Sequence, residues 1–123
     1  MTGSTSPALD VALAYHQAWT SQDLEKATSY IADDIVCDAP TGRLKGAAAY
    51  REFMGPFVQM LTGSKLIAAF GNRQTALVMY DTETVLVKSA PGAECVTVND
   101  GRITYSLFVF DRAPFEAARK NGG

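Results

Sequence analysis

A carboxylate interrupts an apolar strand pattern at Glu94. Alternation along a strand places Glu94 on one face with Val96 and Val98, whereas Cys95 and Thr97 share the opposite face. Burial disfavours the charged form of a carboxyl group and so raises its pKa. We therefore expect Glu94 to be a protonated acid that can donate to a developing oxyanion. The alternative is a carboxylate in water at the end of a hairpin, beside a glycine and an alanine.

Three further carboxylates lie in strand-like segments. Asp38 precedes Pro40, which stops a short strand, and it is a candidate base. Alternatively it bonds to the turn that follows or pairs with Arg43. Asp81 and Glu83 share one strand face at a spacing of about 7 Å, which suits general acid and base chemistry if that face looks inward. We favour an outward face, on which the two are ordinary solvated charges.

The first helical segment carries the aromatic candidates. Tyr15 and Trp19 recur on the face that turns inward, so they are core residues or, in a hollow fold, the lining of a pocket. His16 lies at the margin of that face and is a candidate for ligand binding or for a general base. It has no serine or cysteine partner at a recognisable spacing, so we expect no nucleophilic triad.

Composition argues against a nucleic-acid-binding protein, a membrane protein and a metalloprotein. The 123 residues carry a net charge of -2, and their lysines and arginines are scattered, so we expect no nucleic-acid partner. No apolar run approaches the roughly 20 residues of a membrane span, and the polar start does not resemble a signal peptide. We expect a cytoplasmic protein without membrane contact. Cys37 and Cys95 form no metal-ligand pattern, so free thiols, no metal and no cofactor are predicted.

Helical periodicity precedes strand alternation along the chain. Apolar spacing predicts helices over about 7–21, 24–31 and 47–60. Alternation predicts strands over about 35–40, 65–72, 75–87, 94–99 and 102–110, with a tight turn at 99–101. This segregation indicates one α+β domain over residues 1–123, whose three N-terminal helices cover one face of a curved, mostly antiparallel sheet. We expect flexible ends at 1–6 and 117–123.

The last predicted strand is apolar on both faces. We assign one row to an apolar pocket: Ser106, Phe108 and Phe110. We assign the other row to a partner subunit: Tyr105, Leu107 and Val109. A homodimer is predicted because an exposed apolar patch of this size rarely persists on a monomer. The third predicted helix adds pocket-wall candidates that suit a hydrophobic small molecule: Met54, Phe57 and Met60.

Three phrases carry a family resemblance: the segment 30–40 that ends in Asp-Ala-Pro, Gly46 before the third helix, and Asp-Gly-Arg-Ile at 100–103. With them the chain resembles, over nearly its whole length, the SnoaL-like branch of the nuclear transport factor 2-like superfamily. The resemblance implies a cone-shaped α+β barrel whose sheet encloses a deep apolar pocket. The superfamily includes ketosteroid isomerases, polyketide cyclases, epoxide hydrolases, dehydratases and proteins without chemistry, so the fold alone does not name the reaction.

The resemblance also suggests a site. Ketosteroid isomerases use a tyrosine on the first helix, a carboxylate base at the end of the first strand and a protonated carboxyl group on the penultimate strand. Tyr15 corresponds to the first position and Glu94 lies near the third. Asp38 is the candidate base, but the family's aspartate directly precedes the proline, where this chain has Ala39. Unless a bulge resets the register, Asp38 therefore points out of the pocket.

These candidates lead to two hypotheses. With Tyr15, Asp38 and Glu94 as catalytic residues, the chain is a cofactor-independent enzyme of the isomerase or cyclase type, acting on a hydrophobic carbonyl or polyketide-like compound. The expected substrate-binding residues lie on the first helix, the third helix and the last strand: His16, Trp19, Met54, Phe57, Met60, Ser106, Phe108 and Phe110. The alternative is a noncatalytic small-molecule binding or dimerisation module.

Overall fold

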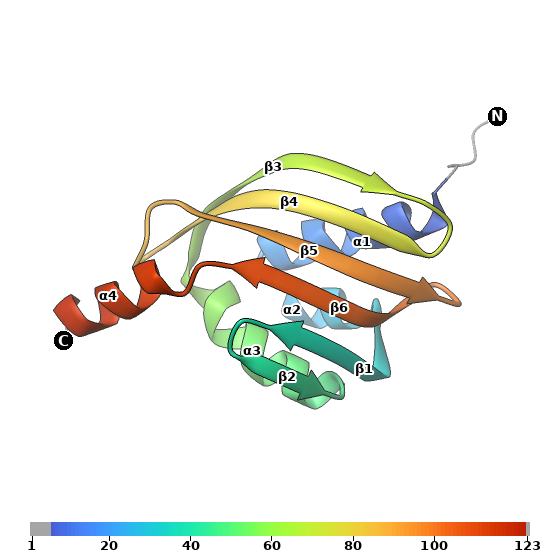
Figure 1. Ribbon diagram of the computed structural model, residues 1–123, viewed down its shortest axis with the longest axis horizontal. Coiled ribbons are helices and arrows are strands. Elements are labelled where there is room, and N and C mark those ends of the chain that lie inside the picture. Colours follow the sequence, from blue (N-terminus) through green and yellow to red (C-terminus); the bar gives the residue numbers. More distant parts are fainter. Residues whose placement is uncertain (1–5, 123) are drawn as a thin grey trace.

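The computed structural model describes residues 6–122. Its helices are α1 (Pro7–Thr20), α2 (Leu24–Thr28), α3 (Ala47–Met60) and α4 (Ala113–Gly122). Its strands are β1 (Ile31–Ala39), β2 (Gly42–Lys45), β3 (Leu61–Gly71), β4 (Thr75–Thr84), β5 (Ala90–Asn99) and β6 (Arg102–Phe110). Helices α1, α2 and α3 lie against one side of a curved sheet, and α4 extends from the end of β6 (Figure 1).

The strands form one sheet in the order β2-β1-β6-β5-β4-β3. Neighbouring strands are antiparallel except β1 and β6, which are parallel. The predicted α+β class and the curved, mostly antiparallel sheet are therefore confirmed. The sheet is open, since its end strands β2 and β3 do not pair with each other, and the concave face between them receives the helices (Figure 1).

Local signals explain where several elements begin and turn. Ser6 caps α1 by accepting a hydrogen bond from the Leu9 backbone nitrogen at 3.1 Å. Asp23 caps α2 in the same way through Lys26. Positive φ angles at Asp100 (52°) and Gly101 (78°) form the tight turn between β5 and β6, as the sequence predicts for a two-residue hairpin.

The structure differs from the sequence prediction at some element ends. The second helix stops at Thr28, and the chain forms β2, a strand that was not predicted and that pairs with β1. The chain also forms α4, where we expected a loose end. Of the ends expected to be flexible, residues 1–5 and 123 lie outside the described part of the chain. Ser6 is buried at the start of α1, and 117–122 belong to α4.

The two faces of the sheet divide as the alternation predicts. On β6, Ser106 and Phe108 are buried under the helices, and Phe110 is half-buried. On the opposite face Leu107 and Val109 are 40% and 57% exposed. The two rows thus lie on opposite faces, one under the helices and one exposed, and a partner for the exposed row stays a prediction. In the described part of the chain, no helix has the length and apolar character needed to cross a membrane.

Candidate functional site

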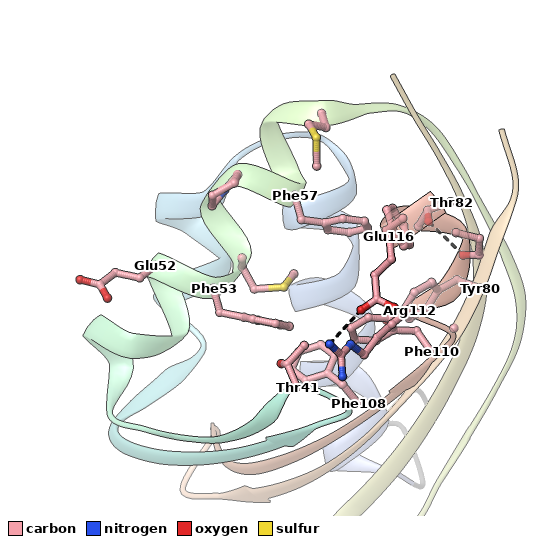
Figure 2. A pocket seen from close by; sticks show the side chains of 16 residues that line it. Thr41, Glu52, Phe53, Phe57, Tyr80, Thr82, Phe108, Phe110, Arg112 and Glu116 are labelled. Atoms are coloured by element: carbon pink, nitrogen blue, oxygen red, sulfur yellow. Dashed lines mark hydrogen bonds and ion pairs between the residues drawn. The ribbon is translucent and has the colours of Figure 1, made fainter. Parts of the chain in front are cut away.

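A cavity of about 460 Å³ lies between α3, the inner face of the sheet and the start of α4. In Figure 2, α3 forms one side of it and the strands form the other. Its lining comes from elements that are far apart in the sequence: Thr41, Glu52, Phe53, Met54, Pro56, Phe57, Met60, Tyr80, Thr82, Ala90, Gly92, Phe108, Phe110, Arg112, Phe115 and Glu116. Five of the expected binding residues belong to this lining: Met54, Phe57, Met60, Phe108 and Phe110.

Aromatic rings dominate the cavity wall. Phe53 of α3 faces Phe108 of β6, with their ring centroids 5.7 Å apart. Phe57 faces Phe115 of α4 at 6.4 Å, so the C-terminal helix closes part of the cavity. Such a wall favours a hydrophobic ligand because its rings offer a large apolar surface with few hydrogen-bonding groups. Phe115 could not be identified from the sequence, since α4 was not predicted.

Charged groups are confined to the edge of the cavity. Arg112 Nη2 and Glu116 Oε2 form an exposed ion pair at 3.0 Å. Glu52 belongs to the lining, but its carboxylate points away from the aromatic rings (Figure 2). The cavity therefore has a polar edge and an apolar interior.

Glu94 lies on the inner face of the sheet, beside the cavity-lining Phe108 on the neighbouring strand. Cross-strand pairing aligns the residues of the cavity row: Tyr80, Gly92 and Phe110. The next row consists of Val78, Glu94 and Phe108. Gly92 leaves the ring of Tyr80 close to the backbone, since an added Cβ would stand 3.3 Å from Tyr80 Cε1. Glu94 itself is not part of the lining.

The carboxyl group of Glu94 is held in a buried polar cluster. Its side chain is 3% exposed, and Ser106 Oγ donates to Glu94 Oε2 at 2.7 Å. Burial raises the pKa of Glu94 from 4.5 to about 7, and the Ser106 and Tyr15 hydroxyls oppose part of that rise. The sequence-based expectation of a carboxyl group with a raised pKa agrees with this burial. The structure brings two expected catalytic residues together: Tyr15 and Glu94.

Tyr50 of α3 is a member of this cluster that sequence reasoning missed. Its hydroxyl forms a short hydrogen bond with the hydroxyl of Tyr15, and both rings are buried. Burial raises the pKa of Tyr50 well above 10.0, so its hydroxyl stays protonated. No local signal in the sequence indicated which residue the Tyr50 hydroxyl would meet, because its partner Tyr15 lies on another helix.

Asp38 does not join the cluster. Its carboxylate lies on the outer face of the sheet, where it accepts from Arg43 Nε at 2.8 Å, from Arg43 Nη2 at 2.9 Å and from the Tyr105 hydroxyl at 2.7 Å. The inward position belongs to Cys37, which is buried opposite Ser106. The expectation that Asp38 acts as a base beside Tyr15 and Glu94 is corrected by this strand register. The alternative pairing with Arg43 is the one observed.

His16 and Trp19 lie behind the cavity wall, outside its lining. The Trp19 ring contacts Phe57 at 5.9 Å and Tyr80 at 5.2 Å between centroids, and it is fully buried. His16 contacts Trp19 at 5.0 Å and Tyr80 at 5.1 Å. Burial lowers the pKa of His16 from 6.5 to about 4, so its imidazole is neutral at neutral pH. Ser106, also expected to bind substrate, instead holds Glu94.

The remaining acidic and thiol candidates lie away from the cavity. Glu83 is exposed, and the half-buried Asp81 accepts from the Ser89 hydroxyl at 2.9 Å, as the outward interpretation of this strand face predicts. Cys37 and Cys95 are free thiols. Among the described residues, no group of three histidine, cysteine or carboxylate side chains is arranged to hold a metal ion.

Comparison with known proteins agrees with this architecture. The SnoaL-like domain family matches residues 12–106. A crystal structure of a protein from Kribbella flavida DSM 17836 is 55% identical, with a TM-score of 0.91 over 95% of this chain and 98% of that chain. No curated protein sequence matches significantly.

Two more distant structures share the fold. TerC, co-crystallised with polyporic acid, is 19% identical with a TM-score of 0.72, over 93% of this chain and 98% of that chain. A Sinorhizobium meliloti protein provisionally named a polyketide cyclase is 18% identical with a TM-score of 0.71, over 81% of this chain and 94% of that chain. At these identities the likeness shows the architecture alone.

Proposed function

Since the chain belongs to the SnoaL-like domain family, we propose that it is an enzyme that acts on small molecules by cofactor-independent acid–base chemistry. The proposed reaction is of the isomerase or cyclase type. The proposed substrate is a hydrophobic carbonyl or polyketide-like compound. One observation carries the proposal: the buried carboxyl group of Glu94 lies in the row of side chains next to an aromatic cavity of about 460 Å³. An acid beside an apolar cavity suits a ligand that is mostly hydrophobic and carries an oxygen.

The cavity supports the proposed ligand class. Its volume falls within the roughly 300–1,000 Å³ of small-molecule sites, and its walls are mainly aromatic rings and methionines. The names of two structural relatives point the same way, since one was co-crystallised with polyporic acid and the other is provisionally a polyketide cyclase.

In this proposal Glu94 acts as the acid. Because its pKa is raised to about 7, a large share of the carboxyl group is protonated at neutral pH and can donate to a carbonyl oxygen of the ligand. Donation stabilises the negative charge that develops on that oxygen in the transition state. Ser106 and Tyr15 hold the carboxyl group in place, and a ligand reaches it past the ring of Phe108.

A noncatalytic binding module is the second candidate. It is favoured by the position of Asp38, whose carboxylate lies on the outer face and is occupied by Arg43 and Tyr105. Among the described residues, Glu94 is the one buried carboxylate, so the inner face supplies an acid without a matching carboxylate base. A protein of this kind would bind the same ligand without turning it over.

The experiment begins with native mass spectrometry of protein purified directly from cells, to identify a bound apolar molecule. Turnover and affinity for that molecule are then measured in Glu94→Gln, with Glu83→Gln on the exposed face as the matched control. We expect Glu94→Gln to lose about 100-fold or more in turnover and to keep its affinity, because loss of a general acid typically costs this much. Absence of turnover in the wild-type protein would favour the binding module.

We also propose a homodimer that forms through the outer face of the sheet. Exposed apolar side chains continue across three strands, because cross-strand pairing aligns Leu77, Cys95 and Leu107 in one row and Met79, Ala93 and Val109 in the next. A partner copy would cover this patch, whose exposure is costly in water.

A cytoplasmic location is part of the same proposal. Both cysteines are free thiols, as expected in a reducing compartment. Fractionation of cells that produce the protein would test this location.

A further inference from the structure

Two buried ring nitrogens behind the cavity wall are left without partners. Trp19 Nε1 and His16 Nδ1 have no hydrogen-bond partner among the described residues, although Trp19 is fully buried and His16 is 7% exposed. Buried polar groups are nearly always hydrogen-bonded, since leaving one unpaired costs stability. The partner of each nitrogen is therefore a buried water or a group of a ligand rather than another described residue.

The two rings adjoin the cavity wall. Trp19 contacts both Phe57 and Tyr80, and His16 contacts Tyr80. Phe57 and Tyr80 both line the cavity (Figure 2). The two rings that carry these nitrogens thus pack against the back of cavity-lining rings, Trp19 against Phe57 and Tyr80 and His16 against Tyr80.

We propose that Trp19 Nε1 and His16 Nδ1 form a polar subsite, behind the rings of Phe57 and Tyr80, that receives a carbonyl oxygen of the ligand. The indole nitrogen can only donate, and a neutral imidazole can carry its proton on Nδ1. Two donors match the two lone pairs of a carbonyl oxygen. The inference rests on the proposed function, and it adds that the ligand carries an oxygen acceptor at this subsite, separate from any oxygen that meets Glu94.

The test uses two probes of nearly equal shape, 2-acetylnaphthalene and 2-isopropenylnaphthalene. The first is a ketone, and the second is an alkene that carries a methylene group in place of the carbonyl oxygen. Trp19 is the single tryptophan of the chain, so its indole N–H gives one resonance in a ¹⁵N-labelled sample. Both probes change that resonance through ring currents. We expect that only the ketone shifts the indole proton resonance downfield, as a hydrogen bond to that proton does. We also expect that only the ketone slows the exchange of the indole proton with solvent.

Affinities provide the second measurement. Trp19→Phe keeps a ring but removes the donor, so ketone binding should weaken about 2- to 10-fold while alkene binding changes little. Normalising the ketone to the alkene within each variant corrects for any general loss of packing. In Glu94→Gln the preference for the ketone should persist, because the subsite is distinct from the carboxyl group.

Each outcome decides a different question. If both probes bind equally well and shift the indole resonance equally, the subsite is wrong and the binding function stands. If the ketone preference survives Trp19→Phe but disappears in Glu94→Gln, the carbonyl meets Glu94 and the subsite is also wrong. If neither probe binds at all, the proposed hydrophobic pocket fails, and the subsite fails with it.

Discussion

Burial determines the chemistry of Glu94 at the scale of the single residue. The unfolded chain ionises this carboxyl group near 4.5, whereas the folded protein does so at about 7. Below pH 4.5 both states are protonated and the residue costs no stability. Between the two values the unfolded state has already released its proton, so stability falls as the pH rises. Above about pH 7 the cost is constant, at roughly 3 kcal/mol, because one pKa unit is worth about 1.4 kcal/mol.

Glu94→Gln should therefore stabilise the fold in a pH-dependent way. The amide keeps the shape of the protonated acid but does not titrate, so the variant and the wild type should have similar melting temperatures near pH 4. At pH 8 we expect the variant to melt roughly 10 °C higher. Calorimetry or circular dichroism at several pH values would measure this. A difference that stays flat across the range would show that Glu94 does not titrate with a raised pKa.

Strand register decides the role of Asp38 at the scale of the element. Neighbouring residues of β1 point to opposite faces, so Cys37 meets Ser106 inside while Asp38 meets Arg43 and Tyr105 outside. Hydrogen bonds from Arg43 and Tyr105 hold the pKa of Asp38 at about 2. The contacts tie β1 to β2 and to β6, which is a structural role.

Asp38→Asn should accordingly leave ligand binding and turnover unchanged. It should lower the melting temperature slightly at neutral pH, since it removes a partly exposed ion pair. A carboxyl group with a depressed pKa stabilises the fold above its unfolded pKa of 3.8 and loses that effect as the pH falls through about 2. The difference between variant and wild type should then vanish in strong acid. Loss of turnover at neutral pH would restore Asp38 as the catalytic base.

At the scale of the whole molecule, a single chain leaves the apolar outer face of its sheet exposed to water. Leu107→Glu places a charge in the middle of this patch and should split the proposed dimer, because a buried unpaired charge is costly. Light scattering at micromolar concentration should then report a mass near 13.2 kDa, against twice that value for the wild type. Val85→Glu, at an exposed apolar residue beyond the end of β4, is the matched control.

Thiol labelling gives an independent readout of the same interface. Cys95 lies between Leu77 and Leu107 on the outer face, so a dimer should protect it from maleimide and Leu107→Glu should expose it. Cys37 is buried and should react slowly in either state. A monomeric wild type whose Cys95 labels rapidly would contradict the dimer.

Local periodicity determined much of this architecture. The third helix matches 47–60 and the last strand matches 102–110, because helical and strand periods depend on residues close in sequence. The same alternation placed Glu94 with the buried row and Leu107 with the exposed one, and it left Asp38 pointing outward in the absence of a bulge. Turn chemistry at Asp100 and Gly101 determined the hairpin that aligns these rows.

Only the tertiary structure decided which side chains meet. Tyr15 and Tyr50 are 35 residues apart, and their contact depends on how α1 and α3 pack on the curved sheet. The same packing placed Trp19 behind the cavity wall and brought Phe115 against Phe57. Periodicity predicts that a side chain is buried, but it does not predict which partner the side chain contacts. That partner depends on sheet curvature and helix position, which are set by contacts distant in sequence.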